Sequence, residues 1–185
     1  MTSRNALGMT VAVVLALAGC SKDSSPTAPI AFDPAGTNQS VLTAVVGSGT
    51  GGVSVTPLAV SGGFFTADIK VRLHGTKPNS IYTVQRAPEI GRALGSDGVC
   101  QRALGISPWS PSDPPASAFV TFNQPGTTTA YTVTSSAAGE ATLDFTFSAP
   151  SVPTGTRFDV MFRLMDDLAA PTSLFMSGCF TVTVL

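Results

Sequence analysis

The stretch Phe65-Thr66-Ala67-Asp68-Ile69-Lys70-Val71-Arg72-Leu73-His74 decides the fold class of this chain. Apolar residues at every second position alternate with polar ones, which is the period of a strand that buries one face. The same alternation returns in residues 142–148 and 158–165. The sequence therefore predicts strands with one face in a core and the other in solvent.

Weaker strand signals and turn residues fill the rest of the chain from residue 40 onward. No helical run separates these strands, so the prediction is an all-β fold of about eight or nine strands. The leading architecture is a two-sheet antiparallel β-sandwich of the immunoglobulin-like kind, and a closed barrel is the second. The weaker strand candidates are residues 41–46, 52–60, 81–86, 118–123, 130–134 and 174–185.

The composition supports this prediction and excludes one class of partner. Charged residues make up 11% of the 185 residues, and the formal net charge is −1. Such a balance favours short strands and turns over charged amphipathic helices. Because basic residues are not interleaved with aromatic ones, we expect no nucleic-acid binding.

The first residues carry a targeting signal. Arg4 precedes a small-and-apolar run at 6–17, which ends in Leu17-Ala18-Gly19-Cys20. The run is too short to span a bilayer as a helix. These last four residues resemble the lipobox of the bacterial lipoprotein signal peptide. The resemblance implies cleavage before Cys20, attachment of diacylglyceryl at its sulfur with acyl chains such as palmitate, and a membrane anchor in the lipid bilayer.

This signal sets the expected domain organisation. Residues 1–19 form the signal peptide, and residues 20–39 form the lipidated cysteine and a flexible tether rich in Ser, Pro, Thr and Ala. Residues 40–185 form the β-sandwich domain, with a long insertion at 87–115. Ser21 stands where the lipoprotein family places an aspartate for inner-membrane retention, so the resemblance implies the outer membrane of a bacterial cell envelope. Exposure to the periplasm or to the cell surface stays open.

The three cysteines fit one assignment. If Cys20 takes lipid, Cys100 and Cys179 remain as an even pair in an oxidising compartment, which predicts a disulfide bond. The alternative is two buried free thiols. Successive side chains of a strand point to opposite faces, so if Phe180 points inward in the last strand, Cys179 points outward. The disulfide bond would then fasten the insertion to the outside or edge of the sandwich.

The segment Leu73-His74-Gly75-Thr76-Lys77-Pro78-Asn79-Ser80-Ile81-Tyr82-Thr83-Val84 resembles the strand, proline turn and Tyr-x-Val of fibronectin type III and other immunoglobulin-like domains. The resemblance implies that the hydroxyl of Tyr82 bonds the backbone just upstream. The segment is also similar to sandwiches of the superoxide-dismutase and chordin-repeat type, so it supports the architecture without choosing a family.

The sequence predicts no catalysis, metal or cofactor. His74 is the only histidine, and a copper or zinc site of the superoxide-dismutase kind needs several. We find no G-x-S-x-G elbow, H-E-x-x-H pair or P-loop. His74 shares its parity with Lys70 and Arg72, which favours a solvated position at the end of a strand.

One enzymatic alternative remains, a glycan-active hydrolase that uses two carboxylates about 5 to 10 Å apart. Asp166-Asp167 is the only adjacent acidic pair, and before Pro171 we expect solvated loop acids with at most a weak calcium contact. Asp97, in Gly95-Ser96-Asp97-Gly98, is expected to be a turn residue. The carboxylates considered are Glu89, Asp97, Asp144, Asp159, Asp166 and Asp167.

Basic residues gather between residues 70 and 102, and acids gather after residue 113. If these cations share a face, they would bind an anionic glycan or an envelope protein; the alternative is a solvated sheet face whose charges pair with the acidic half. Trp109, in Ser107-Pro108-Trp109-Ser110-Pro111, either contacts a partner or caps the sandwich. The interpretation is a non-catalytic binding or structural module, with candidate binding residues Arg86, Arg92, Arg102 and Trp109.

Overall fold

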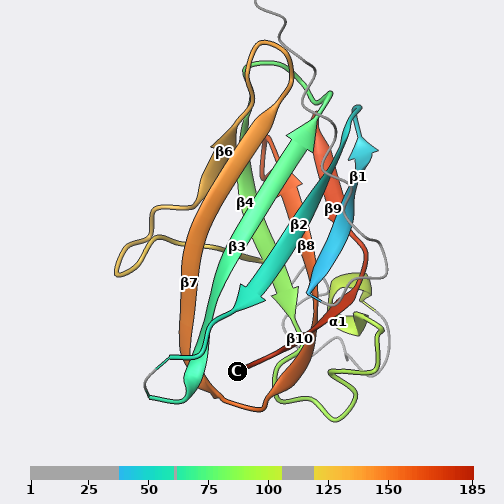
Figure 1. Ribbon diagram of the computed structural model, residues 1–185. Coiled ribbons are helices and arrows are strands. Elements are labelled where there is room, and N and C mark those ends of the chain that lie inside the picture. Colours follow the sequence, from blue (N-terminus) through green and yellow to red (C-terminus); the bar gives the residue numbers. More distant parts are fainter. Residues whose placement is uncertain (1–37, 61, 106–118) are drawn as a thin grey trace, which may run out of the picture. The chain divides into compact units, whose positions relative to one another are not determined.

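The computed structural model describes residues 38–60, 62–105 and 119–185. Within these residues the regular structure is strand apart from one four-residue helix, which confirms the all-β prediction (Figure 1). The proposed signal peptide, Cys20 and nearly all of the tether lie outside the described residues. The elements are β1 (Gln39–Val46), β2 (Thr50–Pro57), β3 (Phe64–His74), β4 (Ile81–Pro88), α1 (Gln101–Leu104), β5 (Val120–Thr121), β6 (Thr132–Thr134), β7 (Ala141–Pro153), β8 (Arg157–Met165), β9 (Leu174–Ser177) and β10 (Phe180–Thr183).

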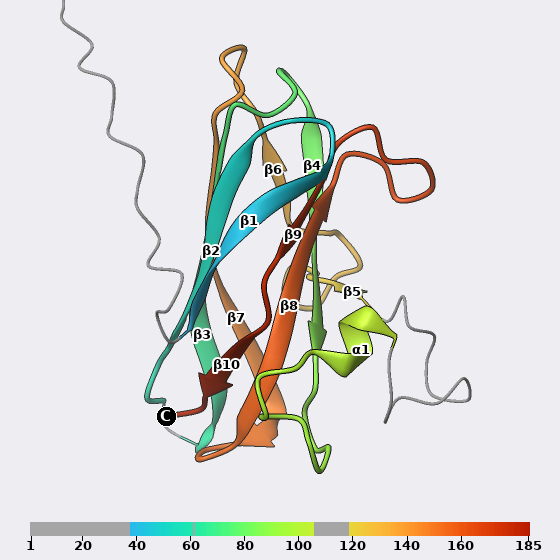
Figure 2. The same cartoon turned by 90° about the vertical axis from the view of Figure 1, so that its right-hand side faces the viewer.

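The strands form one antiparallel sheet in the order β5-β4-β8-β9-β1-β2-β3-β7. β10 pairs with β8, and β6 pairs with β4. β1 bonds to β2 on one edge and to β9 on the other, where Leu42 lies opposite Ser177. The sheet is curled into a half-barrel, so β2 and β3 lie across the interior from β4 and β8 (Figure 2). Hydrogen bonding is thus continuous through β1 and β9, where two separate sheets were predicted.

The interior of the half-barrel is filled by the side chains at the inward-facing positions of each strand. Phe65, Ile69, Phe162 and Phe175 are among the side chains that are at most 5% exposed. Burying residues of this size contributes about 1.5 to 3 kcal/mol each, and this is the main stabilisation of the sheet.

The two edges of the curled sheet face each other along a seam between β7 and the strands β4, β5 and β6. Aromatic rings meet there instead of backbone groups. The Phe122 centroid lies 5.3 Å from that of Phe145 and 5.1 Å from that of Phe147. Tyr131 stacks on Phe145 at 4.1 Å. Side-chain packing therefore closes the seam in this part of the chain.

The strands predicted at 65–74 and 158–165 are confirmed as β3 and β8, and the one at 142–148 lies inside β7. The prediction of a solvated face is wrong for β8, because Asp159, Met161 and Met165 on that face are at most 7% exposed. The stretch predicted at 174–185 divides into β9 and β10, because Gly178 and Cys179 interrupt the pairing. β4 extends two residues into the predicted insertion, since Ala87 and Pro88 pair with Met161 and Val160.

The residues that follow β4 form a strap, residues 89–105, over the outward face of β4 and β8. Figure 2 shows α1 on the side of these strands that faces away from β3. The backbone N–H of Asp159 donates to the carbonyl of Gly95 at 2.6 Å. A Cβ at residue 95 would lie 2.1 Å from the carbonyl oxygen of Glu89, so this close approach admits only glycine.

The predicted disulfide is confirmed between Cys100 of the strap and Cys179 between β9 and β10, with Cα atoms 5.5 Å apart. Its neighbour Phe180 points inward and is 7% exposed, which leaves Cys179 on the outward parity as predicted. The bond therefore fastens the strap to the outside of the sheet.

Candidate functional site

An apolar cavity of about 60 Å³ lies inside the half-barrel, where β4 ends and β8 begins. Side chains from strands on both sides of the interior line it, and all but one are apolar. The exception is Arg86. The lining includes Val55, Phe65, Phe147, Phe158 and Val182. The site is thus an apolar hollow with a single cation in its wall.

Arg86 points inward because it has the parity of Tyr82 and Val84 on β4. Its guanidinium carbon lies 4.1 Å from the ring centroid of Phe122 and 4.3 Å from that of Phe147. These are cation–π distances, and they hold the charge at the seam. Burial, together with the positive charge of Arg102, lowers the pKa of Arg86 to about 10, so the side chain keeps its charge at neutral pH.

Arg86 has no acidic partner in the part of the chain that the structure describes. The ion pairs of the described residues include Arg72 with Asp144, His74 with Glu140 and Lys77 with Asp166, and none of these acids lies beside Arg86. The Nη1 of Arg86 approaches the carbonyl of Thr121 at 3.5 Å, at the limit of a hydrogen bond. A half-buried guanidinium with such weak partners retains most of its N–H donors for a ligand.

The strap brings Arg102 into electrostatic range of Arg86, and Arg92 into range of Arg102. Arg102 donates from Nη1 to the carbonyl of Pro88 at 2.9 Å, and its backbone N–H donates to Glu89 Oε1 at 2.6 Å. Burial lowers the pKa of Arg102, Arg92 adds to this effect, and Glu89 opposes it. Arg86 and Arg102 are therefore two neighbouring cations near the cavity, and Glu89 partly offsets the charge of Arg102. Trp109 lies outside the described residues.

The basic residues of β3 do not belong to this region. Arg72 forms a paired contact with the two carboxylate oxygens of Asp144, at 2.9 and 3.1 Å. Lys70 is exposed and lies opposite Asp144 on β7. These cations lie on the outer face of β3, whereas Arg86 lines the interior, so they do not share a face. The predicted pairing of charges with the acidic half applies to Arg72.

His74 is also paired. Its Nδ1 lies 2.5 Å from Glu140 Oε2, and its side chain is 36% exposed. The expected position at the end of a strand is observed, with a carboxylate neighbour in addition to solvent.

The carboxylates of the hydrolase alternative are separated by the fold. Asp144 is engaged with Arg72 on the outer face, and Asp97 accepts the Val99 N–H at 2.9 Å, as expected of a turn residue. Glu89 and Asp159 lie opposite each other at the ends of β4 and β8, where the Glu89 N–H donates to the Asp159 carbonyl at 2.9 Å. Glu89, the first residue of the strap, is 1% exposed, and Asp159, which lies beneath the strap, is 0% exposed.

Asp159 anchors the strap. Its Oδ2 accepts the Gly98 N–H at 2.7 Å, and its Oδ1 accepts the Thr181 hydroxyl at 2.5 Å. Charge-assisted bonds of this kind are about twice as strong as neutral ones. The carboxylate is thus used for holding the strap on the sheet.

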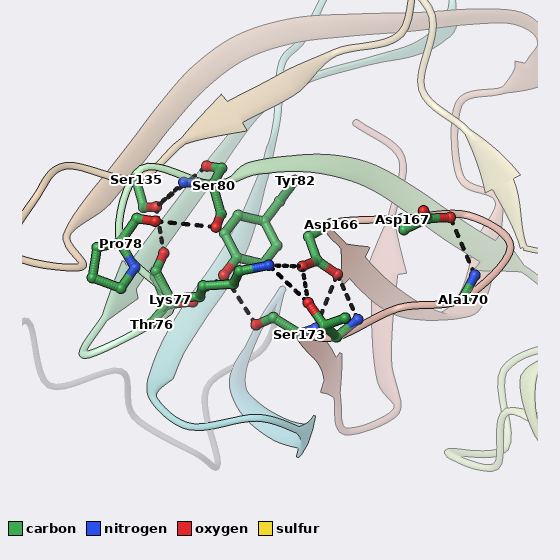
Figure 3. A network of polar contacts seen from close by, with 11 residues as sticks. Thr76, Lys77, Pro78, Ser80, Tyr82, Ser135, Asp166, Asp167, Ala170 and Ser173 are labelled. Carbon is green, nitrogen blue, oxygen red and sulfur yellow. Dashed lines mark hydrogen bonds and ion pairs between the residues drawn. The ribbon is translucent and has the colours of Figure 1, made fainter.

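A saturated polar network lies at the other end of the half-barrel, where β3 ends and β4 begins (Figure 3). Asp166 Oδ1 accepts the N–H groups of Thr172 and Ser173, both at 2.9 Å. Its Oδ2 accepts the Thr172 hydroxyl at 2.6 Å and Lys77 Nζ at 3.0 Å. Burial acts to raise the pKa of Asp166, but these hydrogen bonds outweigh it and hold the pKa well below its usual range.

The expectation of a solvated Asp166 is therefore wrong, because its side chain is 8% exposed and turned into the loop. Asp167 is exposed and accepts the Ala169 and Ala170 N–H groups at 2.8 and 3.1 Å. Figure 3 shows the two side chains directed to different partners, so they do not converge on a common ligand.

Tyr82 belongs to the same network. Its hydroxyl contacts the hydroxyl of Thr76 and donates to Ser173 Oγ at 3.0 Å. The tyrosine does reach an upstream residue, Thr76, but both of its partners are side-chain hydroxyls where the resemblance implied backbone. Ser135 adds a further link, because its hydroxyl donates to the Lys77 carbonyl at 2.7 Å and accepts the Ser80 N–H at 2.9 Å.

No group of three or more His, Cys, Asp or Glu residues in the described ranges is placed to hold a metal ion. Across the same ranges, no helix is long and apolar enough to cross a membrane.

The sequence suggested Arg86 as a binding residue but not the two rings beside it. Phe147 alternates in phase with Phe145, which predicts a core position for its side chain. Its contact with Phe122 forms only because the sheet is curled, and the alternation of residues along a strand does not reveal this curl.

The chain matches no protein-family model, and no curated protein or solved structure is significantly similar to it. The structure itself describes an antiparallel half-barrel domain with an apolar cavity that has one cation, Arg86, in its wall.

Proposed function

We infer that the protein is an envelope lipoprotein, anchored through acylated Cys20 and a short tether, whose β domain is a non-catalytic binding module for an anionic partner. The proposal places the anchor in the outer membrane and names an envelope protein or an anionic glycan as the partner. It also includes Trp109 as a residue that contacts this partner. One observation carries it: Arg86 lies in the wall of an apolar cavity with no acid beside it among the described residues.

Placing a cation there is unfavourable unless something compensates. The phenyl rings of Phe122 and Phe147 offset part of the hydration that Arg86 loses on burial. The positive charge of Arg102, in contrast, makes the protonated state of Arg86 less favourable. A bound anion would compensate the remainder, since charge-assisted bonds from guanidinium to an anion are strong in a partly dry site.

A two-sheet immunoglobulin-like sandwich remains the finer structural proposal. It is supported by the facing arrangement of β2 and β3 with β4 and β8, with the core between them. The continuous pairing of β1 with β9 counts against it.

The hydrolase is the weaker alternative. Its support is that Glu89, which directly follows β4, and Asp159 on β8 are joined by a backbone hydrogen bond. It would require the strap to open, because Glu89 is buried at the start of the strap and Asp159 is buried beneath it.

The anchor and the binding module are tested separately in intact cells. Labelled palmitate should enter the native protein and not a Cys20→Ser variant; equal labelling of both would refute the anchor. Crosslinking should capture a partner with the native chain and lose it with Arg86→Met. A Lys70→Gln variant, which removes an exposed charge from β3, is the matched control. Capture that survives Arg86→Met would refute the binding module.

A further inference from the structure

The cavity and Arg86 together restrict what the proposed module can bind. Because the cation lies in the cavity wall, a ligand that pairs with Arg86 places its remaining atoms among apolar side chains. We propose that the ligand is a carboxylate carrying a short apolar group, with the carboxylate at Arg86 and the apolar group in the cavity. This inference rests on the proposed function and specifies the chemistry of its site.

The size of the cavity limits the apolar group. A cavity of about 150 Å³ holds a benzene ring, so a cavity of about 60 Å³ holds less than half of that number of carbon atoms. Such a space accepts two or three carbon atoms, as in butyrate or isobutyrate. A longer straight chain would have to leave part of its length outside the cavity.

The lining decides against a polar ligand in this position. Apart from Arg86, the cavity is lined by carbon side chains of Val, Ile, Phe, Pro and Ala. A sugar bound there would leave hydroxyl groups without partners, which is costly in a partly dry site. An anionic glycan can therefore meet the arginines at the surface but does not fit the cavity.

The geometry of Arg86 favours a carboxylate as the anion. The planar guanidinium presents paired N–H donors that match the two oxygens of a carboxylate. Phe122 and Phe147 contact it through their rings, so they do not consume these donors. The Thr121 carbonyl at 3.5 Å is the hydrogen-bond acceptor that the described residues offer to the side chain.

Binding of a series of carboxylates to the purified full-length chain tests the proposal, with calorimetry and NMR shifts as readouts. We expect the affinity to rise at least fivefold from acetate to butyrate and to level off at hexanoate. Butanol and butylammonium should bind at least tenfold more weakly than butyrate. Equal binding of butanol and butyrate, or no dependence on chain length, would overturn the proposal.

Variants separate the contribution of the charge from that of the cavity. Arg86→Met should weaken butyrate binding at least tenfold, and Arg86→Lys, which keeps the charge without the paired donors, should lose less. Ala149→Val adds two methyl groups to the lining and should abolish the advantage of butyrate over acetate. Lys70→Gln should leave both affinities unchanged. Circular dichroism and thermal midpoints establish that each variant is folded.

A peptide that ends in valine offers the same chemistry as isobutyrate and separates two sources of the ligand. Tighter binding of the peptide would indicate the C-terminus of a protein, and tighter binding of isobutyrate would indicate a free acid; either supports the proposed chemistry. Failure of both, with cellular capture still dependent on Arg86, would refute this inference and leave the proposed function standing.

Discussion

The two ends of the half-barrel treat polar groups in opposite ways. At the network end, formed around Asp166, Lys77 and Tyr82, each carboxylate oxygen of Asp166 accepts two hydrogen bonds. At the cavity end, around Arg86, a cation is surrounded by rings and carbon side chains and has no acid beside it in the described chain. The first arrangement serves stability, whereas the second leaves a cation that only two aromatic rings and one distant carbonyl compensate, and this difference is the basis of the proposed ligand.

The largest expected effect concerns the strap beside the cavity end. Replacing Cys100 and Cys179 by alanine, in a Cys20→Ser background, should lower the free energy of unfolding by about 4 to 5 kcal/mol, because the bond joins residues separated by 79 positions. Urea denaturation measures the loss, and reductant should reproduce it in the Cys20→Ser protein. A loss below about 1 kcal/mol would show that the strap holds without the disulfide.

The next effect tests the network end. Asp166→Ala leaves the Thr172 and Ser173 N–H groups without their acceptor, and should cost about 2 to 4 kcal/mol of unfolding free energy. Asp167→Ala is the control, because its bonds lie in an exposed loop, and should cost less than about 1 kcal/mol. Similar losses for the two variants would contradict the structural role of the network.

Acid should weaken the same end. The pKa of Asp166 is held below its value in the unfolded chain, so its stabilisation is complete above the unfolded pKa and is lost as the pH falls through the folded one. Stability measured by urea denaturation should therefore fall between about pH 5 and pH 2 more steeply for the native chain than for Asp166→Asn. Parallel pH profiles would exclude Asp166 as the cause.

The smallest expected change in stability is at Arg86. Arg86→Met removes a poorly compensated charge and keeps an apolar stem, so we expect the unfolding free energy to change by less than about 1 kcal/mol in either direction. Thermal and urea midpoints measure it. A loss as large as that of Asp166→Ala would show that the cation–π contacts serve the fold, and would remove the contrast between the two ends.

Strand positions were predictable because their signal is local. Alternation in residues 65–74 and 158–165 states which side chains point inward, and β3 and β8 follow it. Alternation does not state which strands become neighbours, so the pairing of β1 with β9 and the single curled sheet were not foreseen. The pairing of Cys100 with Cys179 followed from counting cysteines once Cys20 had been assigned to lipid.

The candidate site was only partly accessible from sequence. Arg86 was singled out for its charge, and its parity with Tyr82 and Val84 already indicated an inward position. The cavity and the contact with Phe122 depend on strands distant in the sequence. Asp166 was misjudged because a loop carboxylate is normally solvated, and only the folded loop brings the Thr172 and Ser173 N–H groups to it.

The pairing of β1 with β9 also affects the rate of folding. Leu42 and Ser177 are paired although most of the described chain lies between them in the sequence. The curled sheet therefore requires a contact between residues from near the two ends of the domain. Contacts between residues so distant in sequence make folding slow, because loop-closure entropy is lost before the contact forms. Until these contacts form, the inward side of β2 and β3 is exposed to water, and exposed apolar surface of this kind favours aggregation of the unfolded chain.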